Sequence, residues 1–157
     1  MKRKLKRIIG ILLVAAILGS ISVTPVMATN LIEDVNTETN LDYSEDTAYS
    51  VLRGNNLNFG TTSIEKIASN KVGISGITQC HHACATVYLD VYLERKVNGT
   101  YVTYKNWSFT ASNATKIVKD IKVIVPKGYY YRVRGYHAAK DGSKESVRTV
   151  TKGVLVK

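Results

Sequence analysis

This sequence of 157 residues lacks most of the signals that mark a known chemistry. No catalytic motif with a mechanism attached to it occurs anywhere in the chain. Beyond Leu57, no stretch sustains the helical spacing of apolar residues. Only two cysteines are present, and neither directly follows the cleavage point argued below, which speaks against a lipid-anchored lipoprotein. We therefore expect an all-β protein that is not an enzyme and uses no cofactor.

The first residues have the build of a secretory signal peptide, with cationic "MKRKLKR" followed by the short apolar run "IIGILLVAAILGSISV". A transmembrane helix needs roughly 20 predominantly apolar residues, and this run is shorter. Val26 and Ala28 place small side chains at the two positions that a signal peptidase reads. We expect cleavage after Ala28, a secreted, extracellular product and no membrane span in the mature chain. An uncleaved N-terminal anchor is the alternative.

Charge is distributed unevenly after residue 28. Removing residues 1–28 takes away five of the 22 basic residues, so that 17 basic residues face 12 acidic ones and the net charge falls from +10 to +5. Residues 29–52 hold six acidic and no basic residues, whereas residues 53–157 hold 17 basic and six acidic ones, a net charge of +11. The acidic segment is polar and aperiodic, so we expect a flexible leader. Opposite charge would draw it back over the basic domain.

Residues 53–157 form one expected domain, because short β-branched and aromatic runs alternate there with turn residues. In "ATVYLDVYLERKV" (85–97), one side carries apolar residues and the other carries Tyr88, Asp90, Tyr92 and Glu94. Asn98-Gly99 predicts a hairpin, and a change of phase in the next strand predicts a bulge near residues 105–106. The pattern predicts an immunoglobulin-like or fibronectin type III-like β-sandwich of about seven antiparallel strands, with a small barrel as the alternative.

The run "GYYYRVRGYH" (128–137) combines aromatic and basic residues in one strand. Alternation sends Tyr131, Val133 and the other odd positions, His137 included, to the interior, and the even positions to solvent. In a fibronectin-like topology this strand lies beside 85–97. Tyrosine and arginine are enriched in binding surfaces, although ordinary cross-strand pairing accounts for such residues too. The predicted ligand-binding face consists of Tyr88, Tyr92, Tyr130, Arg132, Arg134 and Tyr136.

The pattern Tyr131-x-Val133-x-Gly135, the turn at "KDGSKES" and the closing valine and threonine strand resemble the sixth and seventh strands of a fibronectin type III domain. The wider pattern of "LRGNNLNFG", "GISGITQC", "VYLDVYLER" and "GYYYRVRGYH" is similar to an uncharacterised family of small secreted bacterial proteins with one β-rich domain. That resemblance covers residues 53–157. It implies secretion and a β fold, and it brings no activity with it.

The stretch "CHHAC" (80–84) places two thiols and two imidazoles within five residues. Four ligands crowded into one loop reach a single metal ion with difficulty, because zinc sites collect separated pairs. We expect a Cys80–Cys84 disulfide instead, since the two residues would stand at the feet of a tight loop in an exported protein. Free thiols and a metal site are the alternatives.

These features predict a secreted, non-catalytic binding module whose partner is a cell-wall polyanion, a glycan or a surface protein. Electrostatic attraction would hold such a module near a polyanion. A protein-protein interaction or assembly role, through an edge strand or the tyrosine face, is the second hypothesis, and a secreted enzyme or toxin is the third. Specific nucleic-acid binding is not expected, because an exported protein meets DNA only incidentally as a polyanion. The sequence leaves the oligomeric state open.

Overall fold

The computed structural model describes residues 38–50 and 55–157, and within them it contains strands and no helix. The strands are β1 (Glu38–Thr39), β2 (Tyr43–Tyr49), β3 (Leu57–Ala68), β4 (Lys71–Val97), β5 (Thr100–Ile124), β6 (Tyr129–Asp141), β7 (Ser143–Val150) and β8 (Gly153–Val156). The predicted all-β class is confirmed. In the two described ranges, no helix is long and apolar enough to cross a membrane. The predicted signal peptide, residues 1–28, lies outside them.

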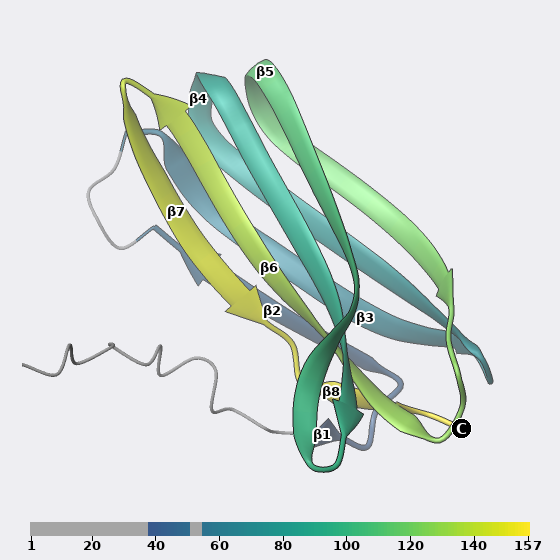
Figure 1. The fold of residues 1–157 in the computed structure, drawn as a ribbon. Coiled ribbons are helices and arrows are strands. Elements are labelled where there is room, and N and C mark those ends of the chain that lie inside the picture. Colours follow the sequence, from purple (N-terminus) through teal and green to yellow (C-terminus); the bar gives the residue numbers. More distant parts are fainter. Residues whose placement is uncertain (1–37, 51–54) are drawn as a thin grey trace, which may run out of the picture.

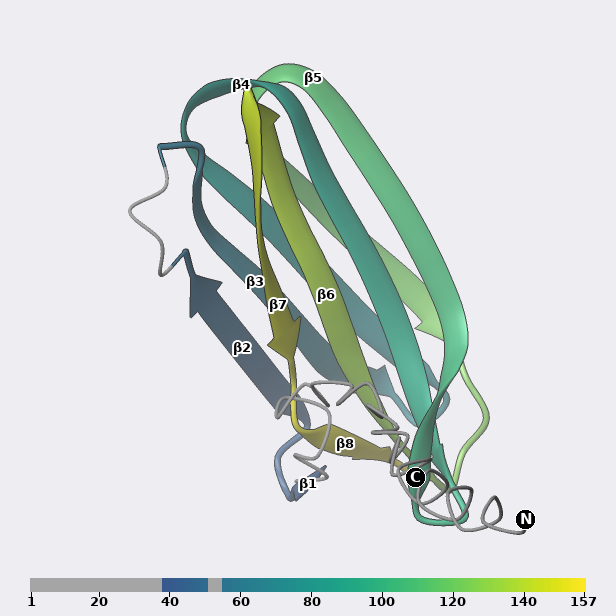
Figure 2. The ribbon, with the colours of Figure 1, turned by 60° about the vertical axis from the view of Figure 1, so that its left-hand side comes forward.

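Two long strands, β4 and β5, each run through both layers of a sandwich. Residues 71–80 of β4 pair with β3, and residues 86–95 pair with β6, so β4 crosses from the back layer to the front layer at its bend (Figure 1). β5 pairs with β4 on both sides of this bend, over residues 71–79 and 84–97, and Figure 2 shows the two strands arching together over one end of the molecule. The back layer therefore holds β2 and β3, and the front layer holds β6 and β7.

The two layers belong to one sheet that wraps until its edges almost meet. The strand order is β1-β8-β6-β4-β3-β2, with β5 added to β4 and β7 added to β6. Side chains of β2 bridge the remaining gap: the Asp46 carboxylate accepts a hydrogen bond from the Val150 amide at 2.8 Å, and the Ser44 hydroxyl accepts one from the Lys152 amide at 2.8 Å. The expected sandwich is thus also close to a barrel.

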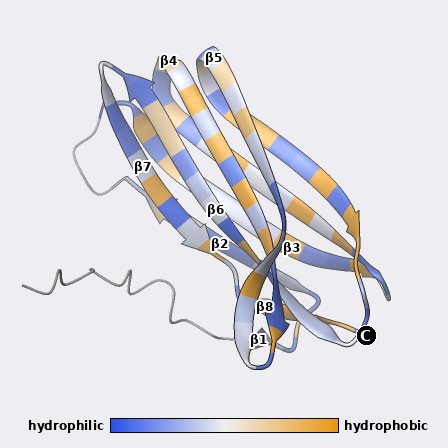
Figure 3. Ribbon diagram, viewed as in Figure 1, coloured by the Kyte–Doolittle hydropathy of each residue, from blue (hydrophilic) through white to orange (hydrophobic). Residues whose placement is uncertain are grey.

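Apolar residues alternate with polar ones along the strands, as the bands of Figure 3 show, and a buried cluster of apolar residues from both layers fills the space between them. The predicted inward set of the 85–97 strand is fully buried: Val87, Leu89, Val91 and Leu93. Tyr131, Val133 and His137 of β6 are buried as predicted too, whereas Tyr129 is 37% exposed. Because apolar burial contributes about 25 cal/mol per Å², this shared interior holds the two layers together.

The prediction of a flexible leader over 29–52 is wrong for the residues that the structure describes. Residues 43–49 pair with β3 along their whole length, and residues 38–39 pair with β8. Acidic side chains in this segment find cations on the domain, as in the ion pairs Asp42–Lys66 (3.0 Å) and Glu38–Lys96 (2.6 Å). The segment therefore returns to the basic domain, as opposite charge suggested, but it does so as two strands of the sheet.

Local turn chemistry is confirmed, and the described residues form eight strands where about seven were expected. Asn98 and Gly99 have positive φ angles of 50° and 84° and connect β4 to β5 in a two-residue turn. The pairs Leu93–Lys105 and Glu94–Thr103 leave Tyr104 as an extra residue, one position from the predicted bulge. The separate strands expected on either side of residues 80–84 form one continuous strand, β4, because its partner β5 bends with it.

Candidate functional site

The pairing of β4 with β6 brings the predicted ligand-binding residues together on the front layer. Tyr92 lies opposite Arg134, and Tyr136 lies opposite Asp90. Alternation then turns these side chains to the outer side of the layer, since their neighbours Leu93 and Val133 are fully buried. The neighbouring placement of the two strands, on which the predicted face depended, is therefore correct.

We call the outer surface formed by Tyr88, Tyr92, Arg134, Tyr136, Lys144 and Arg148 the tyrosine face. The Arg134 guanidinium lies 4.4 Å from the centre of the Tyr92 ring. The Lys144 ammonium lies 4.5 Å from the centre of the Tyr88 ring and 5.4 Å from that of Tyr136. Each tyrosine is half-buried and has a cation stacked near its ring.

Two cations of this surface come from β7 and were missed in the sequence. Lys144 lies opposite Lys140, and Arg148 lies opposite Tyr136; both Lys144 and Arg148 are exposed. Their positions could have been predicted from the sequence, because the turn at Asp141-Gly142 fixes the register between β6 and β7. Counting outward from that turn places Lys144 and Arg148 on the same side as Tyr136.

The prediction that Arg132 points into solvent is wrong. Its side chain is 6% exposed, and its Nε donates to Glu94 Oε2 at 2.7 Å. Arg134 donates to the other oxygen, Oε1, at 2.9 Å, so the buried Glu94 carboxylate is shared by two arginines. A buried carboxylate needs such partners because desolvation of an unpaired charge costs several kcal/mol. Arg132 therefore belongs to a buried ion network and not to the accessible surface.

Tyr101, at the start of β5, covers this network. Its ring centre lies 4.1 Å from the Arg132 guanidinium, and its hydroxyl donates to Glu38 at 3.2 Å. Burial, followed by the charge of Glu38, raises the pKa of Tyr101 well above its ordinary value, so the phenol stays protonated. Tyr130, the remaining predicted residue, is half-buried and pairs with Leu155 of β8. At this covered end of the front layer, Arg132 is therefore not part of the accessible surface, and Tyr130 lies apart from the tyrosine face.

The predicted Cys80–Cys84 disulfide is not formed: both cysteines are buried free thiols. They do not stand at the feet of a loop between two strands, since residues 80–84 are the bend inside β4. Burial, and then the neighbouring Cys84, raises the pKa of Cys80 to about 12. Burial raises the pKa of Cys84 as well. A thiol must ionise to act as a nucleophile or metal ligand, and both thiols are protonated at neutral pH.

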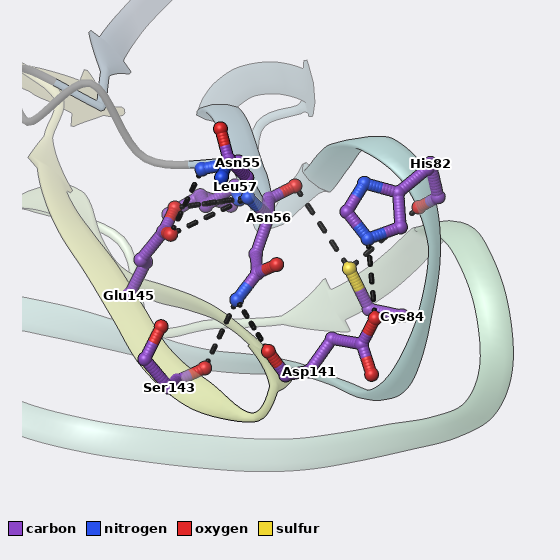
Figure 4. A network of polar contacts seen from close by, with 8 residues as sticks. All are labelled: Asn55, Asn56, Leu57, His82, Cys84, Asp141, Ser143 and Glu145. Atoms are coloured by element: carbon purple, nitrogen blue, oxygen red, sulfur yellow. Dashed lines mark hydrogen bonds and ion pairs between the residues drawn. The ribbon is translucent and has the colours of Figure 1, made fainter.

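A polar network surrounds this bend (Figure 4). The Glu145 carboxylate accepts hydrogen bonds from the backbone amides of Asn55 (3.1 Å), Asn56 (3.3 Å) and Leu57 (2.9 Å). The Asn56 side-chain amide donates to the carbonyl oxygens of Asp141 and Ser143, at 3.2 and 3.0 Å. Together these bonds join the start of β3 to the β6–β7 turn, which is a structural role.

The histidines of "CHHAC" lie on the outside of the same bend. His82 Nε2 is 3.2 Å from Asp141 Oδ2, and both side chains are about half exposed. The Cys84 thiol instead turns inward and donates weakly to the carbonyl oxygens of His82 and Asn56, at 3.6 and 3.9 Å. Within residues 38–50 and 55–157, no three side chains among His, Cys, Asp and Glu are placed to hold a metal ion.

A second polar system, which the sequence did not indicate, crosses the buried space between the layers. His137 is fully buried; its Nδ1 lies 3.0 Å from the Thr78 hydroxyl, and its Nε2 lies 3.0 Å from the Thr149 hydroxyl. Thr78 donates its proton to the Tyr88 carbonyl, so Nδ1 carries the imidazole proton and Nε2 accepts from Thr149. The Thr149 oxygen in turn lies 2.8 Å from Thr62. Burial lowers the pKa of His137 to about 4, so the imidazole is neutral.

Comparison with solved structures gives distant similarity in fold. Spo0M, the sporulation control protein of Bacillus subtilis, is 13% identical with a TM-score of 0.38, over 74% of this chain and 49% of that one, so the chain spans about half the length of Spo0M. Chicken MD-1, solved in complex with lipid IVa, is 14% identical with a TM-score of 0.29, over 69% of this chain and 98% of that one.

The CARDB domain of a Pyrococcus furiosus protein, solved in complex with di-metal ions, is 16% identical with a TM-score of 0.30, over 76% of this chain and 92% of that one. No curated protein matches the sequence. A model of a protein family does match, and it covers residues 28–154, which include β1 and β2 as well as the basic domain. The similarity to an uncharacterised family is thereby confirmed, and the chain belongs to DUF6147, a family of unknown function.

Proposed function

We propose that this protein is a secreted, non-catalytic binding module whose tyrosine face takes an anionic or glycan-rich ligand of a cell surface. The observation that carries the proposal is the position of Lys144, which is exposed and stacked against both Tyr88 and Tyr136. Phenol rings offer flat apolar area together with a hydroxyl group, and a cation beside them attracts an anionic group. Extracellular placement rests on the predicted signal peptide, residues 1–28.

Charge supports an anionic partner. The segment 53–157 has a net charge of +11. Among the described residues of the acidic segment, Glu38 and Asp42 form ion pairs and Asp46 accepts a backbone hydrogen bond. On the tyrosine face, Arg148 adds a further exposed cation opposite Tyr136. Attraction of this kind acts over a Debye length of about 10 Å at 0.1 M salt. Binding should therefore weaken as the salt concentration rises.

Retention on purified cell-wall material at low salt tests the proposal. The double variant Lys144→Gln/Arg148→Gln removes two exposed cations of this surface, and we expect about three- to tenfold weaker retention from two surface contacts. Lys119→Gln/Lys122→Gln is the matched control, because it removes the same charge from exposed positions of β5. Equal loss in both variants would indicate nonspecific attraction by net charge, and no loss in the first would refute a role for the tyrosine face.

A second candidate function, polypeptide binding or assembly, is supported by the free edge of β5. Among the described residues, β5 pairs with β4 and with no other strand, so one edge along Thr100–Ile124 is unpaired. Unpaired edges are templates for strand addition, and natural proteins protect them with lysines, which β5 carries at Lys105, Lys116, Lys119 and Lys122. Sedimentation velocity over a concentration series tests self-assembly: a constant sedimentation coefficient would argue against pairing between copies.

A further inference from the structure

Arg95 lies on the inner side of the front layer, at the end of the sandwich where the β4–β5 hairpin emerges. Its guanidinium lies near two tyrosine rings, with the ring centre of Tyr104 at 5.1 Å and that of Tyr129 at 4.7 Å. A third tyrosine, Tyr131, packs edge-on against Tyr104 at 6.0 Å. The N–H groups of a guanidinium point outward in its own plane, so a further hydrogen-bond acceptor would reach it in that plane.

The charge of Arg95 has no counterion among the described residues. The neighbouring strand β6 supplies two other arginines, Arg132 and Arg134, and these share the Glu94 carboxylate. Arg95 is adjacent to Glu94 in sequence, but alternation places it on the opposite side of the sheet, and no ion pair in residues 38–50 or 55–157 includes it. The nearby cation Lys105, 5.7 Å from the Tyr104 ring centre, adds positive charge at this end.

One donor of Arg95 is also left without a partner. The Nε atom is buried and makes no hydrogen bond within the described part of the chain. Elsewhere on the guanidinium, the Tyr131 hydroxyl accepts a hydrogen bond while donating its own proton to the Pro126 carbonyl at 2.9 Å. A buried donor without an acceptor costs about 1–3 kcal/mol, and a charged donor costs more. Within the described residues, the site therefore combines a charge that has no counterion with a donor that has no acceptor.

We propose that Arg95 binds a single oxyanion group, a carboxylate or a phosphate, carried by a ligand that enters between Tyr104 and Tyr129. Nε and a neighbouring terminal nitrogen form a fork that matches two oxygens of such a group, and charge-assisted hydrogen bonds of this type are the strong ones. Tyr129 gives the ligand access, since it is 37% exposed and follows the turn at Gly128, whose φ is 86°. This site goes beyond the tyrosine face, from which β4 separates it.

The experiment is a nuclear magnetic resonance titration of the folded protein that follows the Nε–H signal of Arg95. Inorganic phosphate and acetate are the two probes, and sodium chloride at equal ionic strength is the reference. We expect a saturable shift of this signal with at least one probe and none with chloride. A shift with phosphate alone identifies a phosphate ligand, and a shift with acetate alone identifies a carboxylate. An Nε–H signal that is unmoved by both would overturn the proposal.

Variants separate this site from general charge and from the tyrosine face. Followed through the backbone amide signal of Tyr129, Arg95→Gln should weaken probe binding at least tenfold, as the loss of a charge-assisted hydrogen bond implies. Lys119→Gln, with the same change in charge, should leave probe binding unchanged. If Arg95→Gln does not fold, Tyr129→Leu provides the test. This variant retains Arg95, and we expect the probes to shift its Nε–H signal less than in the unmodified protein. Lys144→Gln/Arg148→Gln should keep probe binding, so failure of either site is recognised independently of the other.

Discussion

His137 should make the stability of the fold fall as the solution is acidified below neutral pH. The imidazole is fully buried between the layers, and both ring nitrogens are hydrogen-bonded to threonine hydroxyls, Thr78 and Thr149, at 3.0 Å. Burial lowers its pKa from 6.5 to about 4. In the unfolded chain the same group takes up a proton near pH 6.5, so the unfolded state binds more protons than the folded state between these two values.

The magnitude follows from the difference between the two pKa values. A depressed histidine pKa stabilises the folded state fully above pH 6.5, and this contribution is lost as the pH falls toward 4. Each pKa unit corresponds to about 1.4 kcal/mol, so the whole shift is worth about 3 kcal/mol and the interval from pH 6.5 to 5 about 2 kcal/mol. Carboxylates of the unfolded chain titrate mostly below pH 5. The change in the free energy of unfolding between pH 6.5 and 5 is therefore attributed to histidine.

Urea unfolding followed by circular dichroism at a series of pH values from 7.5 to 5 measures the effect. We expect the free energy of unfolding to be constant down to about pH 6.5 and then to decrease by about 1.4 kcal/mol per pH unit. The exposed residues His81 and His82 give the control, because His81→Asn/His82→Asn should retain the slope. A free energy of unfolding that does not change from pH 6.5 to 5 would refute the neutral, buried state of His137.

Three further predictions concern packing and reactivity. Glu94→Gln should lower the free energy of unfolding by about 3–5 kcal/mol, because it leaves two arginines without their carboxylate; the exposed Glu65→Gln is the control, and a loss below about 1 kcal/mol would contradict the buried network. Gly60→Ala should cost about 1–3 kcal/mol or more, since its Cβ would lie 2.2 Å from His137 Cγ, whereas Gly73→Ala, with its nearest atom at 3.6 Å, should be tolerated. Cys80 should react slowly with Ellman's reagent at pH 8 in the folded protein and rapidly in urea; rapid reaction without urea would contradict its pKa of about 12.

Features set by neighbouring residues were predictable from the sequence. The Asn98-Gly99 turn follows from the tolerance of both residues for positive φ, and the bulge at Tyr104 follows from a local change of phase. Alternation placed Leu89 and Val133 inside because the side-chain period of a strand is two. These predictions held because the physical cause lies within a few residues of its effect.

Features set by distant partners were not predictable in this way. Residues 43–49 read as polar and aperiodic, and they become a strand because β3 offers an edge and β7 offers amides to Asp46. The bend at 80–84 read as a loop, and it continues as strand because β5 stays paired on both sides of it. The hydrogen-bond partners of His137 lie 59 and 12 residues away in sequence, at Thr78 and Thr149.

Arg132 and Arg134 show why alternation alone cannot define a binding surface. Both occupy outward positions of β6, two residues apart, and both bind the carboxylate of Glu94. Their side chains are nevertheless 6% and 26% exposed, because the bulged end of the β4–β5 hairpin lays the Tyr101 ring over Arg132 alone. The alternation of side chains along a strand determines which side of the sheet a residue occupies. Whether that residue is then covered depends on the course of another strand. The accessible cations on the outer surface of the front layer are therefore those that lie beyond the reach of Tyr101, among them Lys144 and Arg148.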